Sequence, residues 1–179
     1  IAQYLSDQGF EIENLSSAEA TGLLKEALES NSTEIDVGMA GTAYRFLTAF
    51  YTLQAEEKIL TGAERMKERP IKILVESLRK LGAKINYLER EGYPPLRIRG
   101  KKLEGGSIEI DGSMSSQYIS AILLIAPYLK GGLTIQLVNE VVSAPYIELT
   151  ISLMKQLNVS ATFQNEQLSV KEGNYNANY

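Results

Sequence analysis

The sequence predicts a layered α/β or α+β domain built from a repeated unit of strands and helices. Three observations predict this class. Strand-like and helix-like patterns alternate along the chain. The order strand, helix, strand, helix, strand, strand occurs twice, over about residues 31–100 and 107–171. Each copy closes with two consecutive strands, which argues against a wholly parallel sheet.

A constant spacing relates the two copies. Positions at equivalent places differ by 76 in residue number, in the pairs Gly41 and Gln117, Leu53 and Leu129, Ile59 and Ile135, Ile71 and Ile147, Val75 and Ile151, Leu78 and Met154, and Leu81 and Leu157. Such repetition indicates similar units packed around a shared core. We therefore expect one domain over residues 1–175, with a partial further unit at 1–30 and a tail at 172–179.

The first 30 residues predict a strand followed by a helix. Phe10, Ile12 and Leu15 suit a short strand, and the run at 16–19, Ser-Ser-Ala-Glu, offers hydroxyl caps with an acid in the first helical turn. One helical face then carries Leu23, Leu24 and Leu28. Because the chain opens on Ile1 in what reads as the end of a helix, we expect a fragment of a longer protein.

The first copy contains a strand at 33–37, a glycine-bounded turn at 38–41, a helix at 42–53, a strand at 58–62, a helix from 70 to 81, and strands at 83–88 and 96–99. The buried side of its first helix carries Phe46, Leu47, Phe50 and Leu53. In its second helix, Pro70 suits the first position, Arg79 and Lys80 complement the negative end of the helix dipole, and Gly82 ends the helix.

The second copy repeats this order, with a strand at 108–111, a helix at 116–126, a strand at 133–138, a helix at 146–157, and strands at 160–164 and 168–170. Pro127 would remove a hydrogen bond from the last turn of the first helix. We expect that helix to bend or end there.

The amino-acid composition excludes several classes of partner and of catalytic site. The 179 residues are 44% hydrophobic, enough for a substantial core, and 18 basic against 22 acidic residues give a net charge of -4. This balance argues against a general nucleic-acid or membrane surface. The absence of His and Cys removes disulfides, Cys/His zinc sites and Ser-His triads. The sequence has no membrane span and no signal segment, so we expect a soluble protein. The lack of cysteine is compatible with the cytoplasm, where we expect the protein to be found.

The run Asp111–Gln117, reading DGSMSSQ, is a turn from a strand to a helix that is rich in hydroxyl groups. Such a turn offers unpaired N–H groups and the positive end of a helix dipole, which suit a phosphate or carboxylate. An ordinary Ser N-cap is the alternative. One serine suffices for a cap, and Ser115, Ser116 and Gln117 offer more than that.

Three other turns occupy equivalent places, each after a strand and before a helix. At 38–45, glycines beside Thr42 could admit a ligand to the backbone, or simply form a tight capped connection. At 64–70, Arg65 could bind an anion, or the run could be a solvated surface. At 142–146, Ser143 could be a cap before a Pro-initiated helix. If the four turns converge, several helix N-termini with Arg65 could hold a doubly anionic substrate.

Five stretches of this sequence resemble the EPSP synthase (3-phosphoshikimate 1-carboxyvinyltransferase) family, in order and spacing: GMAGTAYRFLTA, TGAERMKERP, LGAKINYLEREGYPPLRI, DGSMSSQYISAILLIAP and VVSAPYIELTISLMK. The resemblance covers nearly the whole chain. It implies the enolpyruvyl transferase fold, an inside-out α/β barrel domain of three βαβαββ units with helices inside and sheets outside. This chain would be most of one of two such domains.

The resemblance also implies an activity. The enolpyruvyl group of phosphoenolpyruvate is transferred to the 5-hydroxyl of shikimate 3-phosphate, without a cofactor, in aromatic amino acid biosynthesis. Ser115, Ser116 and Ser143 would bind the 3-phosphate, Gln117 would lie against the ring and Tyr146 would line the pocket. The implied phosphoenolpyruvate set, where the family's inhibitor glyphosate also binds, is Gly41, Thr42, Arg65 and Gln117.

Two positions depart from the family pattern. Met39 replaces the usual Asn before Ala-Gly-Thr-Ala, and Phe46 replaces the usual Pro after the Arg, so contacts and helix geometry at this turn are open. The acid/base residues would belong to the missing domain, so we expect the fragment alone to be inactive. The alternatives are the sister transferase acting on UDP-N-acetylglucosamine, and a non-catalytic ligand-binding module on the same fold.

Overall fold

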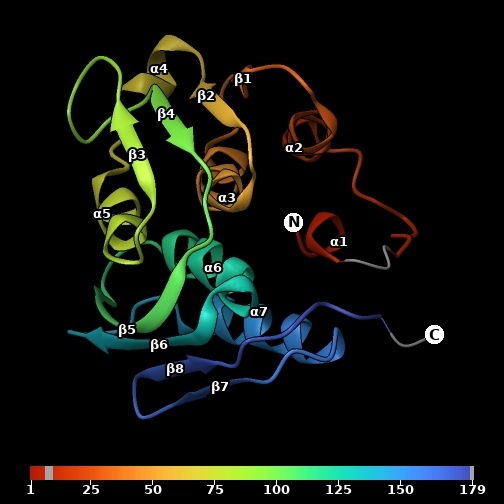
Figure 1. Ribbon diagram of the computed structural model, residues 1–179, viewed down its shortest axis with the longest axis vertical. Helices are drawn as coiled ribbons and strands as arrows, with labels where there is room; N and C mark the ends of the chain where they lie inside the picture. The colour runs from red at the N-terminus through yellow and green to blue at the C-terminus, as the bar shows by residue number, and fades with distance from the viewer. Residues whose placement is uncertain (7–9, 178–179) are drawn as a thin grey trace. The chain divides into compact units, whose positions relative to one another are not determined.

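The computed structural model describes residues 1–6 and 10–177, and the chain divides into two compact units (Figure 1). One unit is Ile12–Lys101, and the other combines Ile1–Glu11 with Lys102–Tyr179. Each unit contains one four-stranded sheet. The assignment of residues 1–175 to a single domain stays a prediction, and parts of the expected partial unit (7–9) and of the expected tail (178–179) lie outside the described residues.

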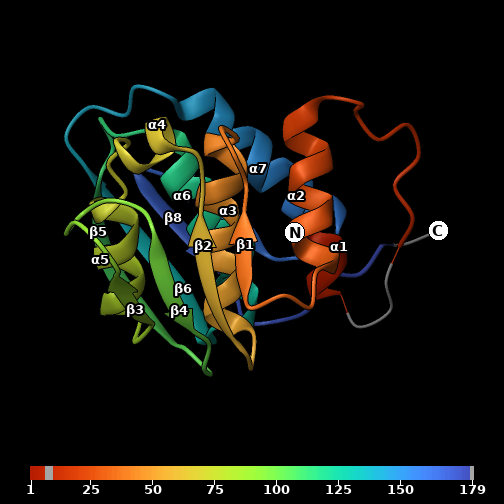
Figure 2. The ribbon, with the colours of Figure 1, turned by 90° about the horizontal axis from the view of Figure 1, so that it is seen from above.

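The 12–101 unit contains α2 (Glu19–Glu29), β1 (Glu34–Asp36), α3 (Gly41–Phe50), the 3-10 helix η1 (Tyr51–Leu53), β2 (Glu57–Thr61), α4 (Glu64–Lys67), α5 (Lys72–Lys80), β3 (Lys84–Tyr87) and β4 (Leu96–Arg99). Its sheet has the order β1-β2-β4-β3. β1 runs parallel to β2, and the other two pairings are antiparallel. Figure 2 shows these strands side by side, with α3 passing behind β1 and β2.

The other unit contains α1 (Ala2–Leu5), β5 (Glu104–Asp111), α6 (Ser116–Ile125), the 3-10 helix η2 (Ala126–Tyr128), β6 (Lys130–Val138), α7 (Ala144–Gln156), β7 (Ala161–Gln164) and β8 (Gln167–Val170). Its sheet has the order β5-β6-β8-β7, again with one parallel and two antiparallel pairings. The predicted α/β class and the βαβαββ order of both copies are therefore confirmed.

The first helix of each copy is buried on nearly every side. In α3 all residues except Thr42 and Phe46 are buried, and in α6 all except Gln117 and Leu124. A helix that is apolar all round belongs inside a core rather than on a surface. α3 packs against α2, α5 and β2, and α6 packs against α7. These central helices carry the turns with the candidate residues at their N-termini.

The second helices of the two copies end in the same way. After α5, Gly82 has a φ of 92°, and the Ala83 N–H donates to the Leu78 carbonyl (3.0 Å). After α7, Asn158 takes the same place with a φ of 63°, and Val159 N–H donates to the Met154 carbonyl (2.9 Å). Both are Schellman ends, which favour Gly or Asn in the left-handed position. The predicted stop at Gly82 is confirmed.

Several local predictions are wrong or shifted. No strand forms at 10–15 in the described chain, where Asn14 has a φ of 53° and Ile12 and Leu15 are half exposed. α2 begins after Ala18 without a side-chain cap among the described residues, because the Ser16 hydroxyl accepts from the Ala18 N–H instead (3.2 Å). Apolar alternation alone makes no strand without a partner to pair with.

Pro70 does not mark the first residue of its helix as predicted, whereas Pro127 does mark the end of its helix. α5 begins at Lys72 rather than Pro70, because Ile71 has a φ of -131° and is the N-cap residue. The Ile71 N–H donates to the Gly92 carbonyl (2.8 Å). α6 ends at Ile125, and the chain continues as the 3-10 helix η2 through Pro127. The expected end of the helix near Pro127 is confirmed.

The spacing between equivalent residues of the two copies is not 76 in every strand. β1 pairs Ile35 with Leu60, and β5 pairs Ile110 with Leu137, so the spacing is 75 in the first strands and 77 in the second. The pair Ile59 and Ile135 is therefore wrong by one residue. Lys58 is the true counterpart of Ile135, and both side chains face the core, 5% and 0% exposed. A one-residue slip moves a side chain to the opposite face of a strand.

The first helices show a similar slip. Gly41 begins α3 and Ser116 begins α6, so Gly41 corresponds to Ser116 rather than to Gln117. The helical pairs from Val75 to Leu81 keep the spacing of 76, because the Schellman ends at Gly82 and Asn158 lie at that distance.

Candidate functional site

The turn between β5 and α6 is organised by Asp111. Its Oδ1 accepts hydrogen bonds from the Ser113 hydroxyl (2.6 Å) and the Ser113 N–H (2.9 Å). These two bonds, with a further one from the Asn139 side chain, hold the pKa of Asp111 below its ordinary value of 3.8. The Ser113 side chain is thus engaged inside the turn.

Ser115, Ser116 and Gln117 stand at the N-terminus of α6. Ser115 is the N-cap residue, and its hydroxyl oxygen accepts a long bond from the Gln117 N–H (3.4 Å). The cap that we weighed as the alternative therefore forms, at Ser115. A hydroxyl that accepts a hydrogen bond keeps its own O–H as a donor. Ser115 is exposed, Gln117 is half-buried and Ser116 is buried.

A second turn, between β6 and α7, is joined to the first. The Gly112 N–H donates to the Val138 carbonyl (2.8 Å), and the Val142 N–H donates to the Gly112 carbonyl (3.3 Å). A Cβ on Gly112 would lie 2.9 Å from Val141 Cγ2, so the close approach requires glycine. The structure therefore brings the turn of Ser115 and Ser116 together with the turn that leads to Ser143.

Ser143 and Tyr146 lie at the start of α7. Ser143 holds the N-cap position, but its side chain makes no capping bond within the described chain. Tyr146 is 66% exposed. Its carbonyl accepts from the Thr150 hydroxyl (3.0 Å), which lies 2.8 Å from the Ser120 hydroxyl of α6. This polar contact joins α6 to α7 one turn or more beyond their N-termini.

The 12–101 unit has an equivalent pair of turns. Asp36 Oδ1 accepts from the Gly38 N–H (2.8 Å), as Asp111 accepts from Ser113. The Ala63 N–H donates to the Gly38 carbonyl (3.0 Å), and a Cβ on Gly62 would lie 2.7 Å from the same oxygen. The turn before α3 and the turn before α4 are therefore joined by their backbones.

Gly41, Thr42 and Arg65 occupy these two turns. Gly41 is buried as the first residue of α3, Thr42 is exposed beside it, and Arg65 is exposed in α4. Met39 is half exposed at the same turn, and α3 runs without interruption through Phe46. Gln117, the fourth member of the predicted phosphoenolpyruvate set, lies in the other unit, so that set is divided between the units.

Two arginines next to Gly41 were not singled out from the sequence. Arg45 is 9% exposed, and its Nη1 donates to the Gly41 carbonyl (2.6 Å). Its spacing of four residues on one helix is a signal that could have found it. Arg69 comes from beyond α4, and a Cβ on Gly41 would lie only 2.2 Å from its Nη1. Nothing local in the sequence indicates that contact.

The described residues contain no group of three or more acidic side chains placed to hold a metal ion. Among the helices of residues 1–6 and 10–177, none has the length and apolar character to cross a membrane.

Comparison with known proteins identifies the family. The family profile described as EPSP synthase (3-phosphoshikimate 1-carboxyvinyltransferase) matches residues 2–177. A 3-phosphoshikimate 1-carboxyvinyltransferase of Bacteroides fragilis (strain YCH46) is 49% identical over 156 residues, which are 87% of this chain and 38% of that protein. One from Sulfurovum sp. (strain NBC37-1) is 50% identical over 141 residues, 78% of this chain and 33% of that protein.

A solved structure shows the same fold. An EPSP synthase from Acinetobacter baumannii matches with a TM-score of 0.72 at 21% sequence identity, covering 83% of this chain and 32% of that one. The chain thus spans between about a third and two fifths of the length of these curated relatives. With a family match over nearly all of its residues, the chain belongs to the EPSP synthase (3-phosphoshikimate 1-carboxyvinyltransferase) family.

Proposed function

We propose that the protein containing this chain transfers the enolpyruvyl group of phosphoenolpyruvate to the 5-hydroxyl of shikimate 3-phosphate, giving 5-enolpyruvylshikimate 3-phosphate and phosphate. The observation that carries the proposal is the family match over residues 2–177, together with relatives at about half identity that bear this name. The reaction, an addition followed by an elimination, needs no metal or organic cofactor. We place it in the cytoplasm.

The shikimate 3-phosphate site is proposed at the joined turns before α6 and α7. Ser115, Ser116 and Ser143 would donate to the 3-phosphate, assisted by the positive end of the α6 dipole. Gln117 would lie against the ring, and the exposed Tyr146 would line the pocket. The hydrogen bonds that join the two turns at Gly112 support this grouping.

The phosphoenolpyruvate site is proposed at Gly41, Thr42 and Arg65. Gly41 leaves the backbone of the turn without a Cβ, and Arg65 makes no ion pair within the described chain, so its guanidinium can bind a carboxylate or phosphate. The acid/base residues are proposed to lie in a second domain of the full-length protein. This chain alone should bind shikimate 3-phosphate weakly and catalyse nothing.

The test is enolpyruvyl transfer by the full-length protein, followed as phosphate release that requires both substrates. Ser115→Ala and Ser116→Ala should each raise the KM for shikimate 3-phosphate about tenfold, the loss of one hydrogen bond to a charged group. Ser113→Ala is the matched control, because that hydroxyl already donates to Asp111. Its KM should stay within about twofold of the parent value, since Ser113 contacts no substrate in this proposal.

Two results would contradict the proposal. Release of phosphate with UDP-N-acetylglucosamine but not with shikimate 3-phosphate would assign the sister reaction. Binding of shikimate 3-phosphate without any transfer by the full-length protein would leave only a ligand-binding module. Calorimetric titration of the 179-residue chain with shikimate 3-phosphate checks the half-site separately, and transfer by that chain would refute the division of the active site.

A further inference from the structure

The carboxylate of Asp111 lies where the turn before α6 meets the turn before α7. We infer that Asp111 is a positioning residue for shikimate 3-phosphate, which holds these two turns together so that hydroxyl groups from both can reach the phosphate. This inference rests on the function proposed above. It concerns a side chain that acts through its neighbours and does not itself touch the substrate.

Strand pairing brings Asp111 next to Asn139. Asp111 is the last residue of β5 and lies opposite Val138, the last residue of β6, in the parallel pairing of these strands. Asn139 follows with a φ of 61°, a left-handed conformation that Asn adopts more readily than most residues. Its side chain donates a hydrogen bond to the Asp111 carboxylate. One bond thus joins the ends of two neighbouring strands, just before each chain turns into a helix.

The same carboxylate fixes the turn that carries Ser115 and Ser116. Its Oδ1 accepts from the Ser113 N–H (2.9 Å) and from the Ser113 hydroxyl (2.6 Å), two residues before the N-cap Ser115. These bonds lower the pKa of Asp111, so the group is an ionised acceptor at neutral pH. Hydrogen bonds to an ionised acceptor are stronger than those between neutral groups.

The other copy has only part of this arrangement. Asp36 ends β1 opposite Thr61, and its Oδ1 accepts from the Gly38 N–H (2.8 Å). The residue after Thr61 is Gly62, which has no side chain to reach Asp36. If the βαβαββ fold itself required the bridge, both copies would contain it. The bridge is therefore better explained by what the turns before α6 and α7 bind.

The sign of the expected effect separates positioning from simple electrostatics. A carboxylate near a phosphate repels it, so removing the Asp111 charge alone would tighten the binding of shikimate 3-phosphate. Removing the hydrogen bonds would instead release the two turns and weaken binding, because binding groups must be held in the right geometry. A higher KM after truncation of Asp111 therefore identifies the positioning role.

The experiment compares Asp111→Ala, Asp111→Asn and Asn139→Gly in the full-length protein at neutral pH, with each substrate varied while the other is saturating. Asp111→Ala should raise the KM for shikimate 3-phosphate about tenfold and leave the KM for phosphoenolpyruvate within about twofold. Asp111→Asn should recover most of this loss, because its amide oxygen still accepts hydrogen bonds. Asn139→Gly keeps the left-handed turn, removes the bridge and should raise the same KM about threefold.

Glu109→Ala is the matched control. Glu109 is exposed on β5, two residues before Asp111, so its replacement removes a carboxylate from the same strand. Both KM values should stay within about twofold of the parent values. A loss of stability alone would reduce the amount of active protein and the apparent kcat, without a selective change in one KM. Ser113→Ala keeps the Ser113 N–H bond to Asp111, which is why its KM should also change little.

An unchanged or lower KM for shikimate 3-phosphate in Asp111→Ala would overturn the inference, and so would an equal rise in both KM values. An unchanged KM in Asn139→Gly would overturn the bridge between the turns. If the parent protein shows no transfer at all, the proposed function fails, and Asp111 is then judged by calorimetric binding of shikimate 3-phosphate to the full-length protein. Weaker binding by Asp111→Ala than by the parent would support its role, whereas equal binding, or none by the parent, would contradict it.

Discussion

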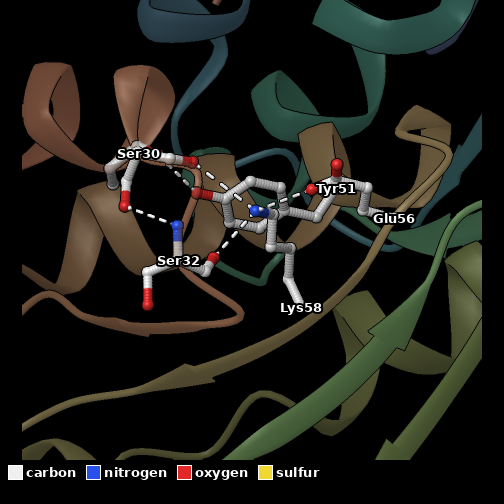
Figure 3. Close-up of polar contacts among 6 residues, drawn as sticks. Ser30, Ser32, Tyr51, Glu56 and Lys58 are labelled. Atoms are coloured by element: carbon white, nitrogen blue, oxygen red, sulfur yellow. Dashed lines mark hydrogen bonds and ion pairs between the residues drawn. The ribbon is translucent and has the colours of Figure 1, made fainter.

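Replacing Lys58 by methionine should lower the free energy of unfolding by about 1 to 2 kcal/mol and loosen α2. Lys58 is a charged residue at a core position of β2 where the other copy has Ile135. Figure 3 shows its ammonium group among Ser30, Ser32 and Glu56. Methionine keeps a similar apolar stem, so the substitution tests the ammonium rather than the packing.

The magnitude follows from three contacts of Lys58 Nζ. The bond to the Ser32 carbonyl is short (2.8 Å), and the one to the Ser30 carbonyl is at the limit (3.5 Å). Hydrogen bonds to a charged group contribute about 1.5 to 3 kcal/mol each when well formed. The pair with Glu56 (3.2 Å) adds about 0 to 1 kcal/mol, because Glu56 is 73% exposed.

Two effects reduce the loss. Removing a buried ammonium also removes the cost of its desolvation. Ser30 and Lys58 line a cavity of about 290 Å³ together with Gln54 and Glu56, among others, so water can replace part of the lost bonding at the Ser30 carbonyl. The net loss in the free energy of unfolding is therefore near the lower end of the range for hydrogen bonds to charged groups.

Lys58→Met should make α2 open more readily, in addition to lowering the stability of the whole fold. Ala27 is the one fully buried residue described in α2. Besides Lys58, the Tyr51 hydroxyl holds this end of the helix through the Ala27 carbonyl (2.7 Å), and burial raises the pKa of Tyr51 to about 12. An element with few buried contacts opens at low free energy. Amide hydrogen exchange in α2 should therefore speed up more than exchange in α3.

The assay is urea denaturation combined with amide exchange. Lys84→Met on β3, where the side chain is exposed, is the matched control and should change stability by less than about 0.5 kcal/mol. Glu56→Gln should likewise change the free energy of unfolding only slightly. If Lys58→Met is as stable as the parent and α2 exchanges at the same rate, the ammonium does not hold the end of α2 and the reasoning is refuted.

Four further substitutions test two turns, helix α2 and the contact between α6 and α7. Gly62→Ala should lower the free energy of unfolding by about 1 to 3 kcal/mol, because the new Cβ would lie 2.7 Å from the Gly38 carbonyl oxygen. Gly22→Ala should instead stabilise α2 by up to about 1 kcal/mol, because no described atom lies within 4 Å of the new Cβ. Urea denaturation measures both changes. The lowered pKa of Asp111 means that its carboxylate stabilises the fold fully above the unfolded-state value of 3.8 and loses this contribution as pH falls through the folded value. Urea titrations from about pH 5 to pH 2.5 should then show a weaker pH dependence for Asp111→Asn, and an unchanged dependence would contradict this. Ser120→Ala removes the 2.8 Å contact with α7 and should lower the melting temperature, at a loss of about 1 kcal/mol.

The candidate site was predictable where its residues are neighbours in the chain. Ser115, Ser116 and Gln117 follow a strand and open a helix, so local pattern placed them at an N-terminus, and the cap at Ser115 formed. The equivalent places of the four turns raised the hypothesis that they converge. The bonds from Gly112 to Val138 and from Val142 to Gly112 join two of these turns within one unit.

The contact of Arg69 with Gly41 was not predictable. Arg69 stood in a charged run whose default interpretation is a solvated surface, and it reaches Gly41 only because the turns at Gly38 and Gly62 are bonded to each other. The phosphoenolpyruvate assignment named Arg65 from the family motif. The folded chain also brings Arg45 and Arg69 to Gly41.

By itself, the sequence determined the features that depend on local periodicity and on single special residues. The alternation of helices and strands, the left-handed end at Gly82 and the end of α6 before Pro127 all follow from bonding within a few residues. The tertiary structure decided which residues face each other across the chain. The strand expected at Phe10 to Leu15 found no partner, and Lys58 rather than Ile59 turned into the core. Strand pairing, register and long side-chain reach depend on what a distant segment supplies, and a linear pattern does not contain that information.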